Sequence, residues 1–310
     1  FALMRESFKS AHPLAQLVML CLIGFGSMFV LFVVAMIPSM IAGDGINMLN
    51  NLGSVSDPNS ESVFFLKILQ IMQAIGLFLV PYLIYRWAAP ERPYSLKWPS
   101  AQVGSLVLFS ILMISALPAI NLMAEWNSGL HLPGFLSGVE DWIYETEASA
   151  ERLIRVFLTM ETTGDLVFNL ILIAFAPAIA EEAFFRGMMQ PIFLRVSKNY
   201  HIAIWTTAFL FSFFHLQFLG FLPRMVLGII FGYAAHWSGS LIIPMVGHFI
   251  NNALAVLLIW MIGMERIESQ VETLGANEGE WYLSIISIAV VAVGMVALYL
   301  RRSNKQKTPA

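Results

Sequence analysis

Eight apolar stretches, separated by shorter polar segments, set the pattern of this chain. They cover residues 14–36, 63–87, 103–123, 166–189, 202–219, 222–237, 241–262 and 281–300. A helix needs about 20 apolar residues to cross the hydrocarbon of a membrane. The pattern therefore predicts an all-α polytopic bundle of about eight transmembrane helices. Only Gly220 and Phe221 separate the fifth and sixth stretches, which favours a tight hairpin there, and the sixth is short.

The composition supports a membrane protein and excludes an ordinary soluble domain. Of the 310 residues, 58% are hydrophobic and 12% are charged, against about 25% charged in soluble domains. The first apolar run, 14–41, is about twice the roughly 7–15 residues of a signal-peptide core, so we expect a retained anchor. The single cysteine, Cys21, excludes an intramolecular disulfide and a cysteine-based metal cluster. We expect membrane lipid around the chain and no nucleic-acid partner.

The charges between the apolar stretches predict the orientation. With eight spans and both termini cytoplasmic, most of the 17 basic residues fall on the inner side and most of the 20 acidic residues on the outer side. Residues 1–310 then form a single membrane domain, with an extracytoplasmic loop at 124–165. The second half of this loop, 141–160, alternates apolar and charged residues, which predicts a helix on the outer interface. We interpret it as a cap over the bundle, with a substrate gate as the alternative.

The fourth stretch ends in charged residues that an apolar helix does not need. Glu181, Glu182 and Arg186 follow the apolar run directly, and ionisable groups within a membrane indicate a functional site. Glu182 and Arg186 are i and i+4 neighbours and are expected to pair, whereas Glu181 points about 100° away. Pro177 should kink this helix and free a backbone carbonyl.

Two further stretches carry polar side chains that could complete a site. His215 is at the end of the fifth stretch, and His248 and Asn252 share one face of the seventh. Each alone is more often a hydrogen bond between helices. Together with two carboxylates they are the groups that activate water and stabilise an oxyanion.

These residues, in this order, resemble the motifs of the CAAX protease and bacteriocin-processing family, the Rce1-like or "Abi" intramembrane proteases. The resemblance covers about residues 164–262, which would be the catalytic core, and implies a glutamate-dependent endopeptidase acting on a peptide or membrane-protein substrate. It implies that Glu181 is the general base and that His215 holds the water. His248 and Asn252 would form the oxyanion site, while Glu182 and Arg186 would orient the motif helix.

Other readings stay open at this point. We favour no metal or other cofactor, because no His-Glu-x-x-His sequence occurs, but Glu181, His215 and His248 are credible zinc ligands. A non-catalytic scaffold or immunity-type protein could bind a peptide or a partner subunit in the same cavity. A proton-coupled transporter is a third class, disfavoured by the absence of an inverted repeat. The compact form favours a bacterial plasma membrane.

Two expectations concern geometry. Gly228 and Gly232 form a G-x-x-x-G pattern, which predicts close packing of the sixth stretch inside the bundle. At about 1.5 Å per residue, Glu181 lies about 24 Å from the outer end of its stretch and His215 about 20 Å from the inner end of its own. In a core of roughly 30 Å, straight helices would leave them more than about 10 Å apart in depth.

Overall fold

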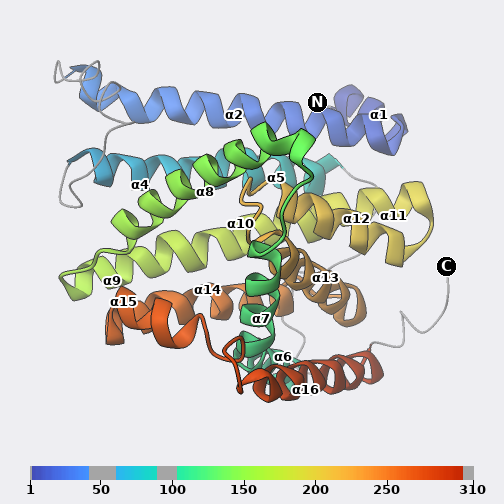
Figure 1. Ribbon diagram of the computed structural model, residues 1–310. Coiled ribbons are helices and arrows are strands. Elements are labelled where there is room, and N and C mark those ends of the chain that lie inside the picture. The colour runs from blue at the N-terminus through green and yellow to red at the C-terminus, as the bar shows by residue number, and fades with distance from the viewer. Residues whose placement is uncertain (1, 42–60, 89–102, 303–310) are drawn as a thin grey trace.

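The computed structural model describes residues 2–41, 61–88 and 103–302 (Figure 1). Its regular elements in these ranges are helices, as the apolar pattern predicts. Of the basic residues that fall on the predicted inner side, Arg92, Lys97, Lys305 and Lys307 lie outside the described residues.

Two layers flank the centre of the bundle. The helices of the first layer, at the top of Figure 1, are α1 (Ala2–Ser10), α2 (Pro13–Ile41), α4 (Glu61–Gln73), the π-helix η1 (Ala74–Leu79) and α5 (Val80–Ala88). Those of the opposite layer are α6 (Val103–Ser115), α7 (Leu117–Ser128), α15 (Met264–Arg266), η6 (Ile267–Val271) and α16 (Trp281–Leu300). Both layers pack on the central helices, which carry all the charged motif residues.

The central layer begins with one helical segment that is longer than the sequence predicts. It runs from Thr163 to Ser197 through α9 (Thr163–Asn169), the π-helix η4 (Leu170–Phe175), α10 (Ala176–Phe184), the π-helix η5 (Phe185–Met189) and α11 (Gln190–Ser197). The predicted end at Met189 is wrong by two turns, because polar residues such as Gln190 and Arg195 continue the helix within the protein. Lys198, in the left-handed conformation at φ 53°, ends it.

The helix that follows is shorter than predicted. α12 (Tyr200–Phe213) stops before His215, and α13 (Phe221–Ser238) and α14 (Ile242–Ile262) complete the central layer. The chain turns at 214–220, where Leu216 has a φ of 53° and the Ser212 hydroxyl donates to the Phe221 carbonyl over 2.6 Å. The hairpin is therefore present, but its connection is longer than the predicted two residues.

These two corrections remove the predicted difference in depth between Glu181 and His215. Glu181 and His215 lie equally far along the chain from the turn at Lys198, which is about 25 Å for each at about 1.5 Å per residue. The expected separation came from ending one helix too early and the other too late.

Several helices are long and apolar enough to cross a membrane, and the chain is an integral membrane protein. Five described helices meet this test by length and composition, or six if the bent pair α6 and α7 is one span. The bend of 45° falls before Pro118 and interrupts the predicted third span. All eight predicted stretches coincide with helices, but the count of eight crossings and the orientation stay predictions.

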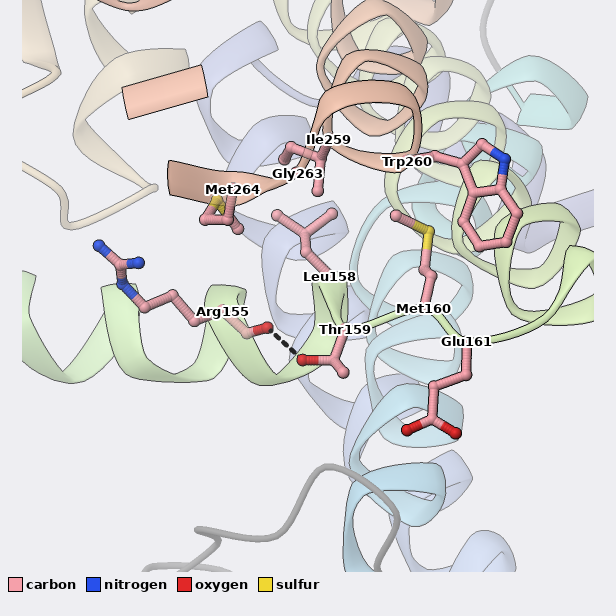
Figure 2. Close-up of a pocket in the computed structure, with 9 residues that line it drawn as sticks. All are labelled: Arg155, Leu158, Thr159, Met160, Glu161, Ile259, Trp260, Gly263 and Met264. Atoms are coloured by element: carbon pink, nitrogen blue, oxygen red, sulfur yellow. Dashed lines mark hydrogen bonds between the residues drawn. The ribbon is translucent and has the colours of Figure 1, made fainter. Parts of the chain in front are cut away.

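A separate amphipathic helix follows the third predicted span. α8 (Ser137–Leu158), preceded by the 3₁₀ turn η3 (Gly134–Leu136), is the helix predicted at 141–160 and contacts α4. A cavity of about 470 Å³ lies between its end and the end of α14, lined by Leu158, Ile259 and Trp260 among others (Figure 2). The Arg155 guanidinium at its edge pairs with Glu151 and Glu268.

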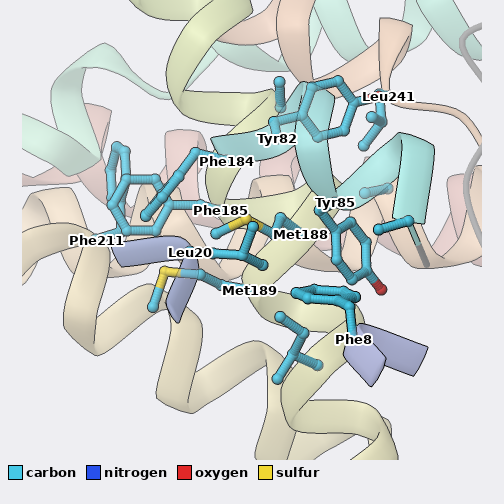
Figure 3. Close-up of a cluster of buried hydrophobic side chains, with 14 residues drawn as sticks. Phe8, Leu20, Tyr82, Tyr85, Phe184, Phe185, Met188, Met189, Phe211 and Leu241 are labelled. Atoms are coloured by element: carbon cyan, nitrogen blue, oxygen red, sulfur yellow. The ribbon is translucent and has the colours of Figure 1, made fainter. Parts of the chain in front are cut away.

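The largest apolar cluster joins the first layer to the centre (Figure 3). Phe185 is completely buried in it and meets the Phe184 and Phe211 rings edge-on, with centroids 5.1 Å apart in each case. On the other side of α12, a β-carbon at Gly232 would lie 2.7 Å from Ile204. The close packing predicted from the G-x-x-x-G pattern is therefore confirmed for α12 and α13.

The orientation can be tested by labelling single cysteines with a membrane-impermeant maleimide in a Cys21→Ser background. Ala148→Cys on α8 and Lys198→Cys at the α11–α12 turn are both exposed positions. We expect Ala148→Cys to be labelled in intact cells and Lys198→Cys only after permeabilisation. Labelling of both in intact cells would contradict the predicted topology.

Candidate active site

Glu181 and His215 lie together at a cavity within the bundle. The Glu181 carboxylate oxygen Oε2 is 3.8 Å from Nε2 of His215. Both residues line a cavity of about 220 Å³, with Pro177, Phe185 and Phe214 among its walls. α10 supplies the carboxylate, and the turn after α12 supplies the imidazole.

The hydrogen bonds of His215 determine which ring nitrogen faces the carboxylate. Nδ1 lies 2.7 Å from the carbonyl oxygen of Phe211, and a carbonyl only accepts, so Nδ1 carries the proton. Nε2 is then the atom that turns to Glu181. Their separation of 3.8 Å is too long for a direct hydrogen bond and suits a bridging water.

The Glu181 carboxylate can accept a further hydrogen bond. Its Oε2 is buried and accepts no hydrogen bond from any residue in the described part of the chain. A buried carboxylate oxygen without a partner is costly, and Glu181 is one of the residues that line the cavity with His215. The pair can therefore take a water or a polar group of a ligand.

Glu182 points away from this cavity into a fully buried ionic network. Arg186 Nη1 donates to Glu182 Oε1 over 2.8 Å, and both side chains are 0% exposed. This is the predicted i, i+4 pair. His248 Nδ1 contacts the same carboxylate oxygen at 3.0 Å, which ties α14 to α10.

Arg186 extends the network to the α12–α13 hairpin. Its Nη2 donates to the carbonyl of Gly228 over 3.0 Å. The guanidinium carbon lies 4.5 Å from the ring centroid of Phe211 and 5.5 Å from that of Phe231. A buried charge is stable only when it is paired and hydrogen-bonded, and these contacts provide both. The network holds four helical segments in one arrangement.

His248 and Asn252 do not line the Glu181 cavity, whose described walls come from other residues. His248 is 5% exposed and stacks on Phe231 at a centroid distance of 5.4 Å. Asn252 Nδ2 donates to the carbonyl of Ile173 over 3.0 Å. The structure thus brings Glu181 to His215 and Glu182 to His248, while the oxyanion roles of His248 and Asn252 stay predictions.

The contact of Asn252 explains how Pro177 is accommodated. Proline has no N–H, so it cannot bond the carbonyl four residues earlier, which belongs to Ile173. Asn252 supplies the missing donor. The predicted free carbonyl is therefore satisfied by Asn252. The segment continues through Pro177, with the π-helix η4 just before it, and the kink stays a prediction.

The zinc alternative finds no matching arrangement. Within the described ranges, no three His, Cys, Asp or Glu side chains are grouped so that they could hold a metal ion. Of the candidate ligands, Glu181 faces His215, whereas His248 is engaged with Glu182. These three residues do not fit a metal site in this arrangement.

Residues 163–254 match a family described as type II CAAX prenyl endopeptidase Rce1-like. Glu181, Glu182, Arg186, His215, His248 and Asn252 all lie in this segment. The likeness to the Rce1-like family covers this segment, which is less than half of the chain. The predicted catalytic core at 164–262 overlaps this segment and stays a prediction.

Part of the chain is also similar in sequence to a curated protein. The chain is 33% identical over 92 residues to uncharacterized protein YpbD of Bacillus subtilis (strain 168). The match covers 28% of this chain and 42% of that protein, so the chain spans less than half the length of this relative. No solved structure matches the chain.

Residues outside the Rce1-like segment also contribute to the site, and the motif pattern did not predict them. Gln70 and Gln73 of α4 line the cavity with Glu181. The signal was available, since these are two amides three residues apart within an apolar stretch. Asn127 and Glu147 hold the turn that carries His215, and no pattern in the sequence relates them to that turn.

Asn127 is the main support of this turn. It is buried, donates to the Phe218 carbonyl over 2.8 Å and accepts from the Leu222 N–H over 2.9 Å. From α8, Glu147 accepts from the Leu219 N–H at 3.5 Å, and the Trp142 ring lies 5.7 Å from that of Phe218. The position of His215 therefore depends on α7 and α8.

We expect Arg186→Met to reduce the free energy of unfolding by on the order of 3 kcal/mol, because it leaves the buried Glu182 without its main partner. The double variant Glu182→Gln with Arg186→Met should recover part of this loss, since no unpaired charge remains. Melting temperatures in detergent give the comparison. Equal temperatures for the single and double variants would show that the charge pair does not govern stability.

We expect Asn127→Ala to expose the His215 turn to solvent. Two backbone groups lose their partner, at about 1–3 kcal/mol for each buried group. Hydrogen–deuterium exchange should rise at 214–222 and stay unchanged at 200–213. The matched control is Asn277→Ala, an exposed asparagine that bonds only within its own turn. Unaltered exchange at 214–222 would exclude the positioning role of Asn127.

Proposed function

We propose that this protein is an intramembrane endopeptidase in which Glu181 activates water to hydrolyse a peptide bond of a membrane-associated substrate. The Rce1-like segment supports peptide hydrolysis in general terms. The proposed role of Glu181 rests on one observation. Its Oε2 lies 3.8 Å from Nε2 of His215, and both residues line the same cavity.

In the proposed reaction a water lies between these two groups. Nε2 of His215 accepts one hydrogen bond from it, and the Glu181 carboxylate removes its other proton. The oxygen then forms a bond with the substrate carbonyl carbon. When the C–N bond breaks, Glu181 returns the proton to the leaving amine, so that the carboxylate is regenerated.

The roles of the remaining motif residues follow from their contacts. Glu182 and Arg186 would hold α10 at a constant rotation, so that Glu181 stays turned to the cavity. Nδ1 of His248 donates to the Glu182 carboxylate, so Nε2 can donate to an oxyanion only when the ring is doubly protonated. Asn252 uses one N–H for Ile173 and retains the other. We propose these two as the oxyanion donors once substrate is bound.

The substrate class is part of the proposal. The family description names a CAAX prenyl endopeptidase, and the relative comes from a bacterium. We therefore propose a peptide or membrane protein as substrate, a bacterial plasma membrane as the location and no resident metal. Two fluorogenic peptides separate the substrate classes, one ending in a farnesylated cysteine and three further residues and the other unmodified.

Glu181→Gln should lower the cleavage rate of these peptides by about 10²–10⁴-fold, because the general base is lost. Glu278→Gln, an exposed carboxylate outside the helices, is the matched control and should cleave normally. The assay uses purified full-length protein in detergent with a zinc chelator present. If the parent protein cleaves the peptides without the chelator but not with it, the zinc alternative would be established instead.

A non-catalytic scaffold remains the competing function, since the same cavity could bind a peptide or a partner subunit without cleaving it. Under that function, Glu181→Gln would retain biological activity at normal protein levels. Full complementation by Glu181→Gln would therefore refute the peptidase proposal.

A further inference from the structure

The wall of the cavity opposite α10 is formed by a helix outside the Rce1-like segment. Gln70 and Gln73 of α4 line it together with Glu181 and His215. Residues three apart on a helix lie on one face, so the two amides form a short polar stripe along the cavity. The other walls are largely apolar, from Ala74, Leu172 and Phe185 among others.

Gln70 has an amide oxygen with no partner. This Oε1 is buried and accepts no hydrogen bond from any residue in the described ranges 2–41, 61–88 and 103–302. A buried acceptor without a partner is destabilising, so a ligand that donates to it is favoured. Glu181 Oε2 is in the same state, so two unsatisfied acceptors belong to residues that line a single cavity.

The backbone just after the two glutamines is held against α2. The Ser27 hydroxyl donates to the Gly76 carbonyl over 2.6 Å, and a β-carbon at Gly76 would lie 2.6 Å from the α-carbon of Met28. Gly76 is in the π-helix η1, which begins directly after Gln73. Such π turns often occur at functional sites. The amides therefore extend from a fixed backbone.

The chemistry of a primary amide indicates what it binds. It offers one acceptor and two donors without charge, which complements the N–H and C=O of a peptide group. A substrate helix that unwinds for cleavage exposes such groups, and inside a membrane they need new partners. The cavity, at about 220 Å³, is below the roughly 300–1,000 Å³ of sites that enclose a whole ligand, so it fits a short stretch of chain.

We propose that Gln70, with Gln73 beside it, binds the main chain of the substrate next to the scissile bond and holds it extended against Glu181. Gln70 Oε1 accepts from a substrate N–H. This inference rests on the proposed peptidase function for its substrate. It adds a main-chain binding site on α4 that sets where the peptide lies.

Binding can be measured separately from cleavage. The probes are the two peptides above and versions in which single amide bonds are replaced by esters, which removes one N–H at a time. They are titrated against full-length Glu181→Gln protein, so that no peptide is consumed. One ester position should weaken binding by roughly 3- to 10-fold, the effect of one hydrogen bond.

We call the loss of binding on replacing one amide bond by an ester the ester effect. The decisive comparison measures this effect in Gln70→Met, which keeps the shape of the side chain and removes the amide. We expect Gln70→Met to weaken binding of the amide peptide and to abolish the ester effect at that one position. Gln270→Met, at an exposed glutamine on η6, is the matched control and should retain the ester effect. Gln73→Met, also at an exposed position, gives a second test if Gln70→Met does not fold.

The outcomes separate this inference from the peptidase proposal. An unchanged ester effect in Gln70→Met, or in Gln73→Met where that variant is used, would overturn the main-chain site, even if the parent protein cleaves the peptide. Amide-dependent binding without cleavage by the Glu181 protein would support the site and reject the peptidase. Absence of any peptide binding would reject both.

Discussion

The buried guanidinium of Arg186 is the interaction on which the centre of the structure depends. A full charge inside an apolar bundle is stable only with an opposite charge and hydrogen-bond acceptors around it. Glu182 supplies the charge, the Gly228 carbonyl supplies an acceptor, and the Phe211 and Phe231 rings cover the guanidinium. These partners come from separate helices, so the helices must meet in one arrangement for the charge to be satisfied.

This network also separates two adjacent carboxylates that differ only in their environment. Glu182 is enclosed and bonded to Arg186 and His248, whereas Glu181, about 100° further around the helix, faces a cavity and His215. Each carboxylate keeps one buried oxygen that accepts no hydrogen bond from the described residues, but of the two only Glu181 lines the cavity. The buried pair beside Glu181 gives its carboxylate a constant direction.

Irregular turns of helix surround the cavity. The π-helices η1, η4 and η5 each contribute a lining residue, namely Ala74, Leu172 and Phe185. The end of α12 before His215 is a fourth irregularity, held from outside by Asn127 and Glu147. Regular helices would pack their side chains into this space. The irregular turns, and the contacts that satisfy their backbone groups, are consistent with a cavity that is kept open within the bundle.

The sequence alone determined the helical membrane fold, the pairing of Glu182 with Arg186 and the close approach at Gly228 and Gly232. These depend on local periodicity and on spacing along one helix, which are readable from neighbouring residues. Only the tertiary structure decided which carboxylate meets which histidine, that Asn252 satisfies the carbonyl freed by Pro177, and that Gln70 shares the cavity. Those contacts join residues far apart in the chain, and their geometry depends on where each helix ends, on its rotation and on its depth in the bundle.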